Sequence, residues 1–390
     1  MKPDGKHRRL AGILAAAAVT TACTASPLAT WPPALDAHRP PEVACTTVPT
    51  ASAPVVGISG KRSLLDMPPV QGGLTDVAAR SSGSALAVGA TVPRSPHSSV
   101  LVAWWNGEVW RTLSDPALPP LSSLGAVAVV PGGGWAVGEY GLTDHGDGGG
   151  VARPLIVRVT GTTMRRVPVP RLTYSSALED VAATSAADAW AVGFTGRGPL
   201  VLHWDGTAWT RTQLPATLER RVMAVDAVAA TSPANAWAVI RFRAGSFPRL
   251  MHWNGSQWGQ VVMPEIGMRY GLYGVAATSA SNVWAVGSGV ILHWDGRRWT
   301  CASISNTLFA VSTSSAVNAW AVGGGEGEAV ALHWNGHTWN QKELTPTRRR
   351  VYFLTGVAAI PHSRRAWAVG TTQTAHNETL MLHWNGTAWQ

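Results

Sequence analysis

The chain has 390 residues, a formal net charge of +9 and 46% apolar residues. Charged residues make up only 14%, below the usual share of about 25%, which excludes a disordered polyelectrolyte and a coiled coil. Three cysteines exclude a disulfide-dense scaffold and a cysteine-rich zinc module. The unusual feature is tryptophan, with 20 residues against 5 Tyr and 5 Phe.

Residues 1–22 are typical of a secretory signal, because a basic start and a short apolar run over residues 10–19 precede small residues. The apolar run is too short for a membrane span. The segment that ends at Cys23 resembles a bacterial lipobox, in which the cysteine is acylated, although Thr20 departs from that pattern. We therefore predict lipidation at Cys23, with ordinary cleavage nearby as the alternative.

Export follows from either outcome at Cys23, so we expect the mature chain on the outer face of the cytoplasmic membrane or secreted. Residues 23–56 are rich in Ala, Pro and Thr and show little periodicity. Such a composition is typical of an extended, proline-stiffened tether. The predicted organisation is a signal peptide over 1–22, a tether over 23–56 and one folded domain over 57–390.

The folded domain consists of seven copies of one repeat unit. The phrase Ala-Trp-Ala-Val-Gly, as at residues 189–193, is followed by Leu-His-Trp-Asp-Gly-x-x-Trp, as at residues 202–209. Eighteen of the twenty tryptophans occupy repeat positions, which explains the composition without a ligand. The repeat tryptophans to which we assign a structural role are Trp190, Trp204, Trp209, Trp237, Trp253, Trp258, Trp284, Trp294, Trp299, Trp320, Trp334, Trp339, Trp367, Trp384 and Trp389.

Each unit is predicted to form four short strands, which we call a to d. Asp-Gly and Asn-Gly between strands c and d favour two-residue hairpin turns, which would pair Trp204 with Thr207 and Leu202 with Trp209. Both faces of the sheet then carry apolar groups, as a sheet packed between two neighbours requires. Short strands in regular blocks of about 45 residues indicate an all-β fold, a seven-bladed β-propeller of four-stranded blades.

The last unit lacks its strand d, because the chain stops at Trp389 and Gln390. Residues 61–69 look like a strand d. They come before the first strand a of the chain, so no preceding unit contains them. We therefore expect the N-terminal segment to complete the last blade, which would tie the two ends of the chain together and remove an exposed sheet edge.

The repeat resembles the kelch-type repeat and the related central domain of galactose oxidase, with a glycine that ends strand b and a tryptophan after the c–d turn. The match covers residues 57–390, but most units lack the second glycine, and only Gly323-Gly324 keeps the pair. The Asp-Gly-x-x-Trp element also looks like the Asp-box turn of sialidase-type propellers. These motifs imply a propeller and no particular activity.

The sequence carries no familiar catalytic motif, and we predict no cofactor, metal or catalytic residue. The histidines before the strand-c tryptophans, such as His203 and His293, are too far apart on neighbouring sheets to share a zinc ion, so we assign them a structural role. The galactose-oxidase resemblance would imply copper chemistry with a Tyr and His ligand set and a Cys–Tyr crosslink, but the cysteines of this chain lie elsewhere in the pattern. The loop from Asp144 to Asp147 has oxygen ligands for Ca²⁺ but is more simply a flexible acidic loop.

If Cys23 is acylated, Cys45 and Cys301 remain in an oxidising compartment. They could bridge the tether to the fifth unit, but two cysteines in unrelated contexts leave the pairing open.

Arginines concentrate in the d–a and b–c connections, which emerge on one face of a propeller. This predicted basic face points to an anionic glycan, a wall polymer or an acidic protein as partner, and not to nucleic acid; the alternative is a solvated arginine-rich surface. Its residues are Arg94, Arg153, Arg171, Arg197, Arg220, Arg221, Arg241, Arg243, Arg249, Arg269, Arg348, Arg349 and Arg350.

Two functions follow as hypotheses. The first is a non-catalytic, monomeric binding propeller held to the membrane by an acyl anchor alone. The second is a propeller-type glycan hydrolase or lyase of the sialidase kind. A pair of carboxylates with perturbed pKa values in a funnel would favour the enzyme, and an arginine-rimmed mouth without such a pair would favour binding.

Overall fold

The computed structural model describes residues 43–49, 70–91, 99–115, 117–141, 151–243, 249–264, 271–325, 328–344, 351–372 and 378–390. Within these ranges the chain is built of strands, with one short helix, α1 (Ala216–Glu219). We number the repeat units 1 to 7 in chain order. No helix among the described residues is long and apolar enough to cross a membrane.

Units 1 to 4 are each a four-stranded antiparallel sheet in simple chain order. Unit 1 contains β2 (Gly72–Ser81), β3 (Ser84–Thr91), β4 (Val100–Trp105) and β5 (Trp110–Leu113). Unit 2 contains β6 (Ser122–Val130), β7 (Gly133–Tyr140), β8 (Arg153–Thr160) and β9 (Thr163–Arg166). Unit 3 contains β10 (Ser176–Ser185), β11 (Asp188–Thr195), β12 (Gly198–Trp204) and β13 (Trp209–Arg211). Unit 4 contains β14 (Val222–Ser232), β15 (Asn235–Phe242), β16 (Arg249–Trp253) and β17 (Trp258–Gln260).

Units 5 and 6 share one sheet, because two strands each serve two positions of the repeat. They contain β18 (Leu272–Ser279), β19 (Asn282–Trp294), β20 (Trp299–Ser315), β21 (Asn318–Gly325), β22 (Glu328–Trp334) and β23 (Trp339–Gln341). β19 covers strands b and c of unit 5, and β20 runs from strand d of unit 5 into strand a of unit 6. Unit 7 is a three-stranded sheet of β24 (Val351–Ala359), β25 (Ala366–Thr372) and β26 (Glu378–Trp384).

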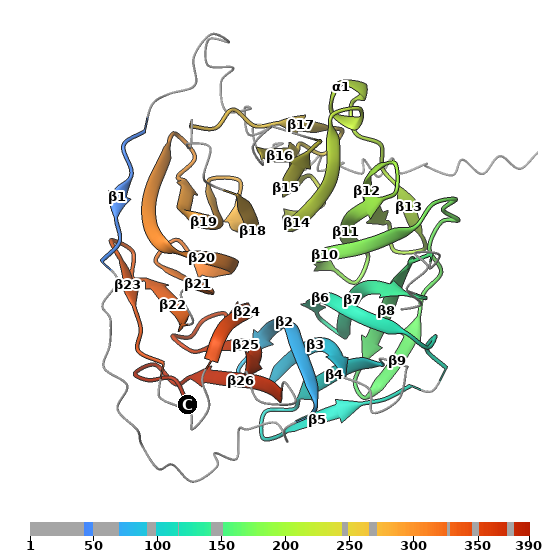
Figure 1. The fold of residues 1–390 in the computed structure, drawn as a ribbon, viewed down its shortest axis with the longest axis horizontal. Coiled ribbons are helices and arrows are strands. Elements are labelled where there is room, and N and C mark those ends of the chain that lie inside the picture. Colours follow the sequence, from blue (N-terminus) through green and yellow to red (C-terminus); the bar gives the residue numbers. More distant parts are fainter. Residues whose placement is uncertain are drawn as a thin grey trace, which may run out of the picture.

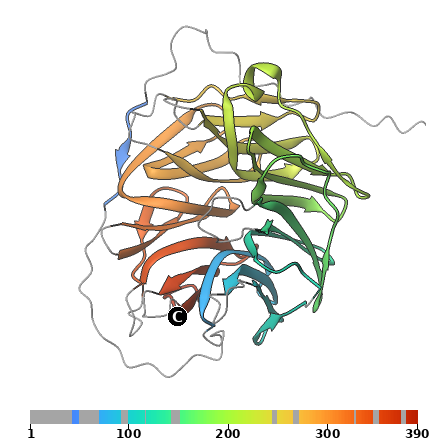
Figure 2. The same cartoon turned by 45° about the vertical axis from the view of Figure 1, so that its right-hand side comes forward.

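The units stand side by side around a central space (Figures 1 and 2). The strands a lie nearest the centre, and each contacts the strand a of the next unit, including β24 of unit 7 with β2 of unit 1. The ring is therefore continuous through packing between the first and last units.

Tryptophan packing joins each unit to the next. The strand-b indole of one unit contacts the strand-c and strand-d indoles of the following unit: Trp190 lies 5.0 Å from Trp253 and 5.2 Å from Trp258. The same contact closes the ring, because Trp367 of unit 7 lies 5.3 Å from Trp105 of unit 1. Unit 1 has Leu86 in place of the strand-b tryptophan, and its cluster contains Val159 and Met164 of unit 2 where other units carry indoles.

Burying large aromatic side chains is the main favourable term in such an interface. The strand-b indoles of units 2 to 7 are all less than 3% exposed. Alternation along strand c serves both sides of a sheet, since Val201 packs in the cluster shared with unit 4 while Leu202 packs in the cluster shared with unit 2. This two-sided apolar sheet agrees with the sequence-based expectation.

The predicted two-residue turn between strands c and d is wrong. Trp204 pairs with Trp209, and His203 pairs with Thr210, so residues 205–208 form a four-residue loop. The Asp205 carboxylate accepts hydrogen bonds from the backbone N–H of Thr207 at 2.8 Å and of Ala208 at 2.9 Å. These side-chain bonds stabilise the wider loop, and Gly206 has the positive φ (96°) that the loop requires.

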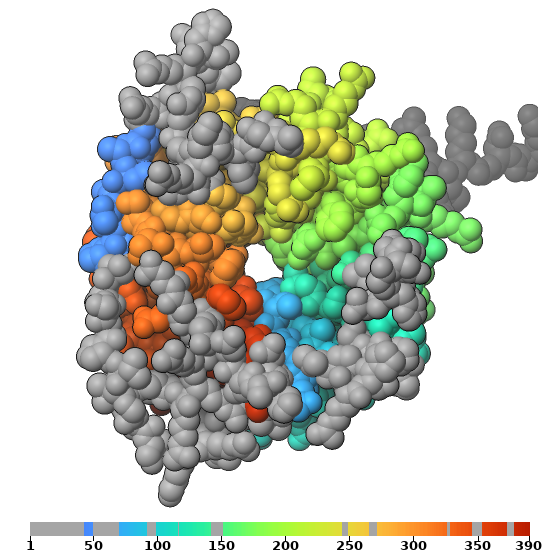
Figure 3. All heavy atoms as spheres, in the orientation of Figure 1, coloured from blue at the N-terminus to red at the C-terminus, as the bar shows by residue number. Residues whose placement is uncertain are grey.

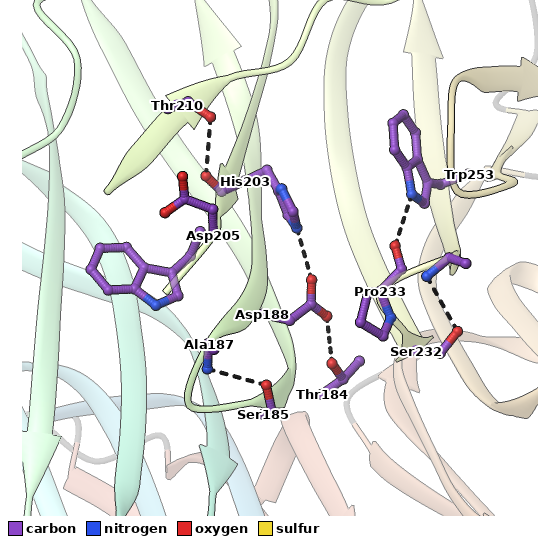
Figure 4. Close-up of polar contacts among 12 residues, drawn as sticks. Thr184, Ser185, Ala187, Asp188, His203, Asp205, Thr210, Ser232, Pro233 and Trp253 are labelled. Atoms are coloured by element: carbon purple, nitrogen blue, oxygen red, sulfur yellow. Dashed lines mark hydrogen bonds and ion pairs between the residues drawn. The ribbon is translucent and has the colours of Figure 1, made fainter. Parts of the chain in front are cut away.

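Figure 4 shows the polar network around His203 in unit 3, and units 4 to 6 contain an equivalent histidine contact. His203 Nε2 lies 2.8 Å from Asp188 Oδ1, the Thr184 hydroxyl donates to the other oxygen of Asp188, and the imidazole stacks on Trp190 at 4.2 Å. Asn replaces the Asp in units 4 to 6, as in the 2.8 Å contact between His333 and Asn318, and unit 7 has Arg365 at this position. Because these contacts occupy the ring within its own unit, the arrangement fits the structural role assigned from the sequence.

Part of the predicted tether is attached to unit 5. β1 (Thr46–Thr47) runs parallel to β20 and pairs with Ala302 and Ser303, and Val48 is buried. Cys45 forms a disulfide with Cys301, which settles the pairing that the sequence left open. Figure 1 shows β1 on the outer side of β20.

Residues just before β2 lie alongside the last unit. Gln71 forms a bridge with Glu378, and the backbone N–H of Thr379 donates to the Val70 carbonyl at 3.1 Å. At the other end of β26, Gln390 exchanges two 2.9 Å backbone hydrogen bonds with His383. The outer edge of β26 is thus paired from both chain ends. The proposed strand over residues 61–69 lies outside the described residues.

Candidate functional site: the central channel and its mouth

A cavity of about 410 Å³ runs between the strands a of all seven units. Figure 3 shows the opening at the centre of the molecule. The lining consists of the Leu-x-x-Val-Ala-Ala segments, so most of it is alanine, valine and backbone. The two variable positions of that segment therefore decide the chemistry of the channel.

The first variable residue forms a β-bulge in every unit. The pairing of strands a and b shifts between Leu178 and Asp180, for example, and leaves Glu179 without a partner across the ladder. The same shift occurs in the other six units. A bulge turns its residue out of the regular sheet face. The seven bulge residues all line the cavity and are, in unit order, Thr75, Gly125, Glu179, Asp226, Tyr273, Phe309 and Thr355.

The bulge explains the glycine of Ala-Trp-Ala-Val-Gly. A Cβ on Gly193 would collide with the Ala177 carbonyl oxygen, and Gly323 faces Thr307 in the same way. Unit 4 has Ile240 at this place and accommodates it with an additional register shift between Val222 and Ala224. The glycine that ends strand b thus allows the bulge residue to reach the channel.

The bulge residues divide the channel mouth, by which we mean Glu179, Asp226, Tyr273 and Phe309, into an acidic half and an aromatic half. Glu179 and Asp226 lie on units 3 and 4, and Tyr273 and Phe309 lie on units 5 and 6. The two threonine bulge residues are less available to a ligand, because the hydroxyls of Thr75 and Thr355 donate hydrogen bonds to carbonyls of the next unit at 2.8 and 2.9 Å.

The acidic half contains more negative than positive charge. Asp226 forms an ion pair with Arg241 at 3.0 Å. Burial raises the pKa of Glu179, against the opposing effect of Arg241, and burial together with the charge of Glu179 raises the pKa of nearby Glu139. Arg241 thus acts on two carboxyl groups, those of Asp226 and Glu179.

Two further carboxyl groups line the channel at the second variable position. Burial raises the pKa of Asp76 to about 6 and that of Asp180 to about 8, and the charge of Asp76 contributes to the shift at Asp180. Asp76 accepts the backbone N–H of Val127 at 2.9 Å, and Asp180 accepts that of Val228 at 2.7 Å. Each carboxyl therefore connects its own unit to the next.

A second cavity, of about 380 Å³, lies where the b–c connection of unit 2 meets the d–a connection to unit 3. Tyr140, Arg153, Arg166, Arg171 and Tyr174 line it, and we call it the arginine–tyrosine pocket. The Arg166 guanidinium lies 4.4 Å from the Tyr140 ring and donates to its hydroxyl at 2.6 Å. Among the described residues, no acidic side chain forms an ion pair with these three arginines.

The structure places the predicted basic face only in part. Arg153 and Arg171 line the pocket, and Arg197 stacks on Tyr174 at 4.2 Å, while Arg241 is paired with Asp226. Arg221 stacks on Phe242 at 5.1 Å, and Arg243 donates to the Arg197 carbonyl. Arg220 is exposed beside α1, and Arg249 is half-buried at the start of β16.

Several predicted residues cannot be placed. The signal peptide, Cys23, the acidic loop from Asp144 to Asp147 and five of the arginines lie outside the described residues. Those arginines are Arg94, Arg269, Arg348, Arg349 and Arg350. Within the described part of the chain, no group of three or more His, Cys, Asp or Glu side chains is placed to hold a metal ion.

Sequence reasoning missed Arg166 and the acidic and aromatic halves of the mouth. Arg166 lies in strand d and not in a connection. The channel residues could have been found by aligning the units on Leu-x-x-Val, because the first variable position holds six different residue types in the seven units. A sheet alone would not require that variety.

No protein-family model and no curated protein matches the sequence. Solved structures do resemble the fold. YCF48 bound to a D1 peptide has a TM-score of 0.52 at 15% identity, over 80% of this chain and 93% of that chain. The fold is a β-propeller.

Two further propellers are similar at low identity. The GH74 xyloglucanase of Xanthomonas campestris has a TM-score of 0.53 at 13% identity, over 82% of this chain and 54% of that chain. The extracellular domain of a one-component system of B. thetaiotaomicron has a TM-score of 0.50 at 10% identity, over 79% of this chain and 38% of that chain. These propellers include a peptide-bound protein, a glycoside hydrolase and an extracellular domain, so the shared fold decides no activity for this chain.

Proposed function

We propose that this protein is a seven-bladed, exported, non-catalytic binding propeller whose basic face holds an anionic glycan, a wall polymer or an acidic protein. Each repeat unit corresponds to one blade, and the N-terminal segment completes the last blade alongside β26. The kelch-type assignment of the repeat belongs to this proposal. The extracellular and glycan-active propellers among its structural neighbours are in keeping with a place outside the cytoplasm.

The arginine–tyrosine pocket carries the proposal. Three guanidinium groups converge on one cavity, and each can bind a carboxylate or sulfate in a bidentate manner. Tyr140 and Tyr174 add aromatic surface to the lining, with one face of each ring covered by the guanidinium of Arg166 or Arg197. None of the acidic side chains that the structure describes forms an ion pair with these arginines.

The test is binding of hyaluronan, polygalacturonate and heparin to the purified mature chain at low and high salt, with neutral dextran for comparison. The double variant Arg153→Ala/Arg166→Ala should weaken anion binding about tenfold or more, since a hydrogen bond to a charged group contributes about 1.5–3 kcal/mol. The matched control, Arg297→Ala/Arg298→Ala, removes two arginines from a c–d turn. Salt-insensitive binding, or an equal loss in the control, would contradict the proposal.

Lipidation has a separate test. Cys23→Ala should move the protein from the membrane fraction to the supernatant, because one acyl-bearing residue is the proposed anchor. An unchanged membrane fraction would contradict the anchor without touching the binding proposal.

A glycan hydrolase is the second candidate function, and one observation favours it. Asp76 and Asp180 line the channel with raised pKa values, as a general acid would. Their hydrogen bonds to Val127 and Val228 argue instead for a structural role. Release of reducing sugar from xyloglucan, sialyllactose or polygalacturonate, lost in both Asp76→Asn and Asp180→Asn, would support the enzyme; the absence of turnover by the wild-type protein would contradict it.

A further inference from the structure

The aromatic half of the channel mouth continues as a row of three rings. Tyr273, Phe309 and Phe353 lie on units 5, 6 and 7, and each neighbouring pair of ring centroids is 6.2 Å apart. Tyr273 is 43% exposed and Phe353 is 48% exposed. Exposed aromatic rows of this kind mark interaction surfaces.

The opposite side of the same mouth is acidic. Glu179 and Asp226 occupy the equivalent bulge positions on units 3 and 4, and Arg241 neutralises only one of them directly. The channel cavity that both halves line measures about 410 Å³ along the strands a of all seven units, which is at the lower end of the range of about 300–1,000 Å³ for ligand sites. It therefore has room for one or two long side chains.

We propose that the channel mouth is a docking site for an extended protein segment that alternates basic and apolar residues, with apolar side chains on the aromatic row and a lysine or arginine directed at Glu179 and Asp226. Charge complementarity selects the basic residue. The aromatic spacing selects the extended conformation, because alternate side chains of a β-strand repeat at about 6.6 Å, close to the 6.2 Å between successive rings.

The bulges make this arrangement possible. They place variable side chains at the rim of the channel, while the glycine that ends strand b in every unit except unit 4 makes room for the bulge. A cation over Tyr273 or Phe309 would gain from the ring faces as well as from the carboxylates. The proposed site has the opposite charge preference to the arginine–tyrosine pocket and does not depend on it.

The test uses a fluorescein-labelled peptide amide of sequence Gly-Lys-Leu-Lys-Leu-Gly and its counterpart with both lysines acetylated, followed by fluorescence anisotropy. The wild-type protein should bind the lysine peptide about tenfold more tightly than the acetylated one. Glu179→Gln and Phe309→Ala should each weaken binding of the lysine peptide about fivefold, as expected for a partly desolvated cation beside an aromatic ring.

Two variants serve as controls. Arg298→Ala changes the charge of a c–d turn, and Arg153→Ala/Arg166→Ala disables the arginine–tyrosine pocket; both should leave peptide binding unchanged. Thermal unfolding confirms that each variant is folded. Three binding results would overturn the proposal: no binding at millimolar peptide, equal binding of the acetylated peptide, or unchanged binding in Glu179→Gln and Phe309→Ala. A fourth is displacement of the lysine peptide by spermidine to the same extent in the wild type and in Phe309→Ala.

Discussion

Individual polar residues in this propeller hold fixed partners inside the sheets, and this makes its stability depend on pH in two opposite ways. The imidazoles of His252, His333 and His383 are partly or fully buried and pack against the strand-b indole of their own unit. The channel aspartates are surrounded by strands a and take up protons readily. Both effects follow from burial, which disfavours the charged form of either group.

The histidines predict acid lability. Burial lowers the pKa of His252, His333 and His383 from 6.5 to about 4. Between these two pH values the unfolded chain binds protons that the folded chain does not bind. The contribution of these histidines to the free energy of unfolding is therefore fully present above pH 6.5 and is lost as the pH falls toward 4. Denaturant titration at about pH 7.5 and about pH 4.5 should show a lower free energy of unfolding at the acid pH. His333→Gln should reduce this difference; a difference that is equal in wild type and variant would contradict the assignment.

Asp180 predicts the reverse trend on the alkaline side. Its pKa is raised from 3.8 to about 8, so the stability it contributes is present below pH 3.8 and is lost as the pH rises toward 8. Asp180→Asn keeps an oxygen that accepts from Val228 and removes the charge. The variant should gain stability relative to wild type at about pH 8.5 compared with about pH 5. Asp205→Asn is the control, because Asn already occupies this turn at Asn254, Asn335 and Asn385; a gain of the same size there would contradict the prediction.

At the scale of the element, the glycine that ends strand b and the bulge in strand a depend on each other. The bulge adds a residue to the inner strand, and the close approach of its backbone leaves no room for a side chain opposite. In the motif Ala-Trp-Ala-Val-Gly, the tryptophan therefore provides packing between sheets, and the glycine provides room for the backbone of the bulge.

Gly193→Ala should lower the free energy of unfolding by about 1–3 kcal/mol, the usual cost of overpacking. The added Cβ would collide with the Ala177 carbonyl and force the bulge at Glu179 to move. Gly83→Ala is the matched control, since the nearest atom to its Cβ would be the Ser81 hydroxyl at 3.9 Å. Denaturant unfolding of both variants measures the effect. Equal stability of the two would show that the bulge tolerates a side chain.

At the scale of the whole molecule, the sequence predicted the repeat, the strands and the two-sided apolar sheets, because these follow from periodic residues that are neighbours in the chain. It did not predict the c–d register, since the Asp205 carboxylate stabilises a four-residue loop that the Asp-Gly pair alone does not reveal. It missed Glu179 and Asp226 because the ring brings residues of different units together, and it missed Arg166 because this residue lies in strand d and not in a connection. The contact of Cys45 with unit 5 was left open for the same reason.

The disulfide gives the last prediction, because it acts on the largest loop of the chain. Cys45 and Cys301 are 256 residues apart in sequence, so their bond restricts nearly two thirds of the unfolded chain. The ring itself is closed by Trp367 against Trp105, which needs no covalent help. Cys45→Ser/Cys301→Ser should therefore stay folded by circular dichroism and lose about 2–5 kcal/mol in the free energy of unfolding. Dithiothreitol should reproduce this loss in the wild-type protein and have no effect on the double variant, because the variant has no bond to reduce. An equal response of both proteins to the reductant would place the stabilising effect elsewhere in the molecule.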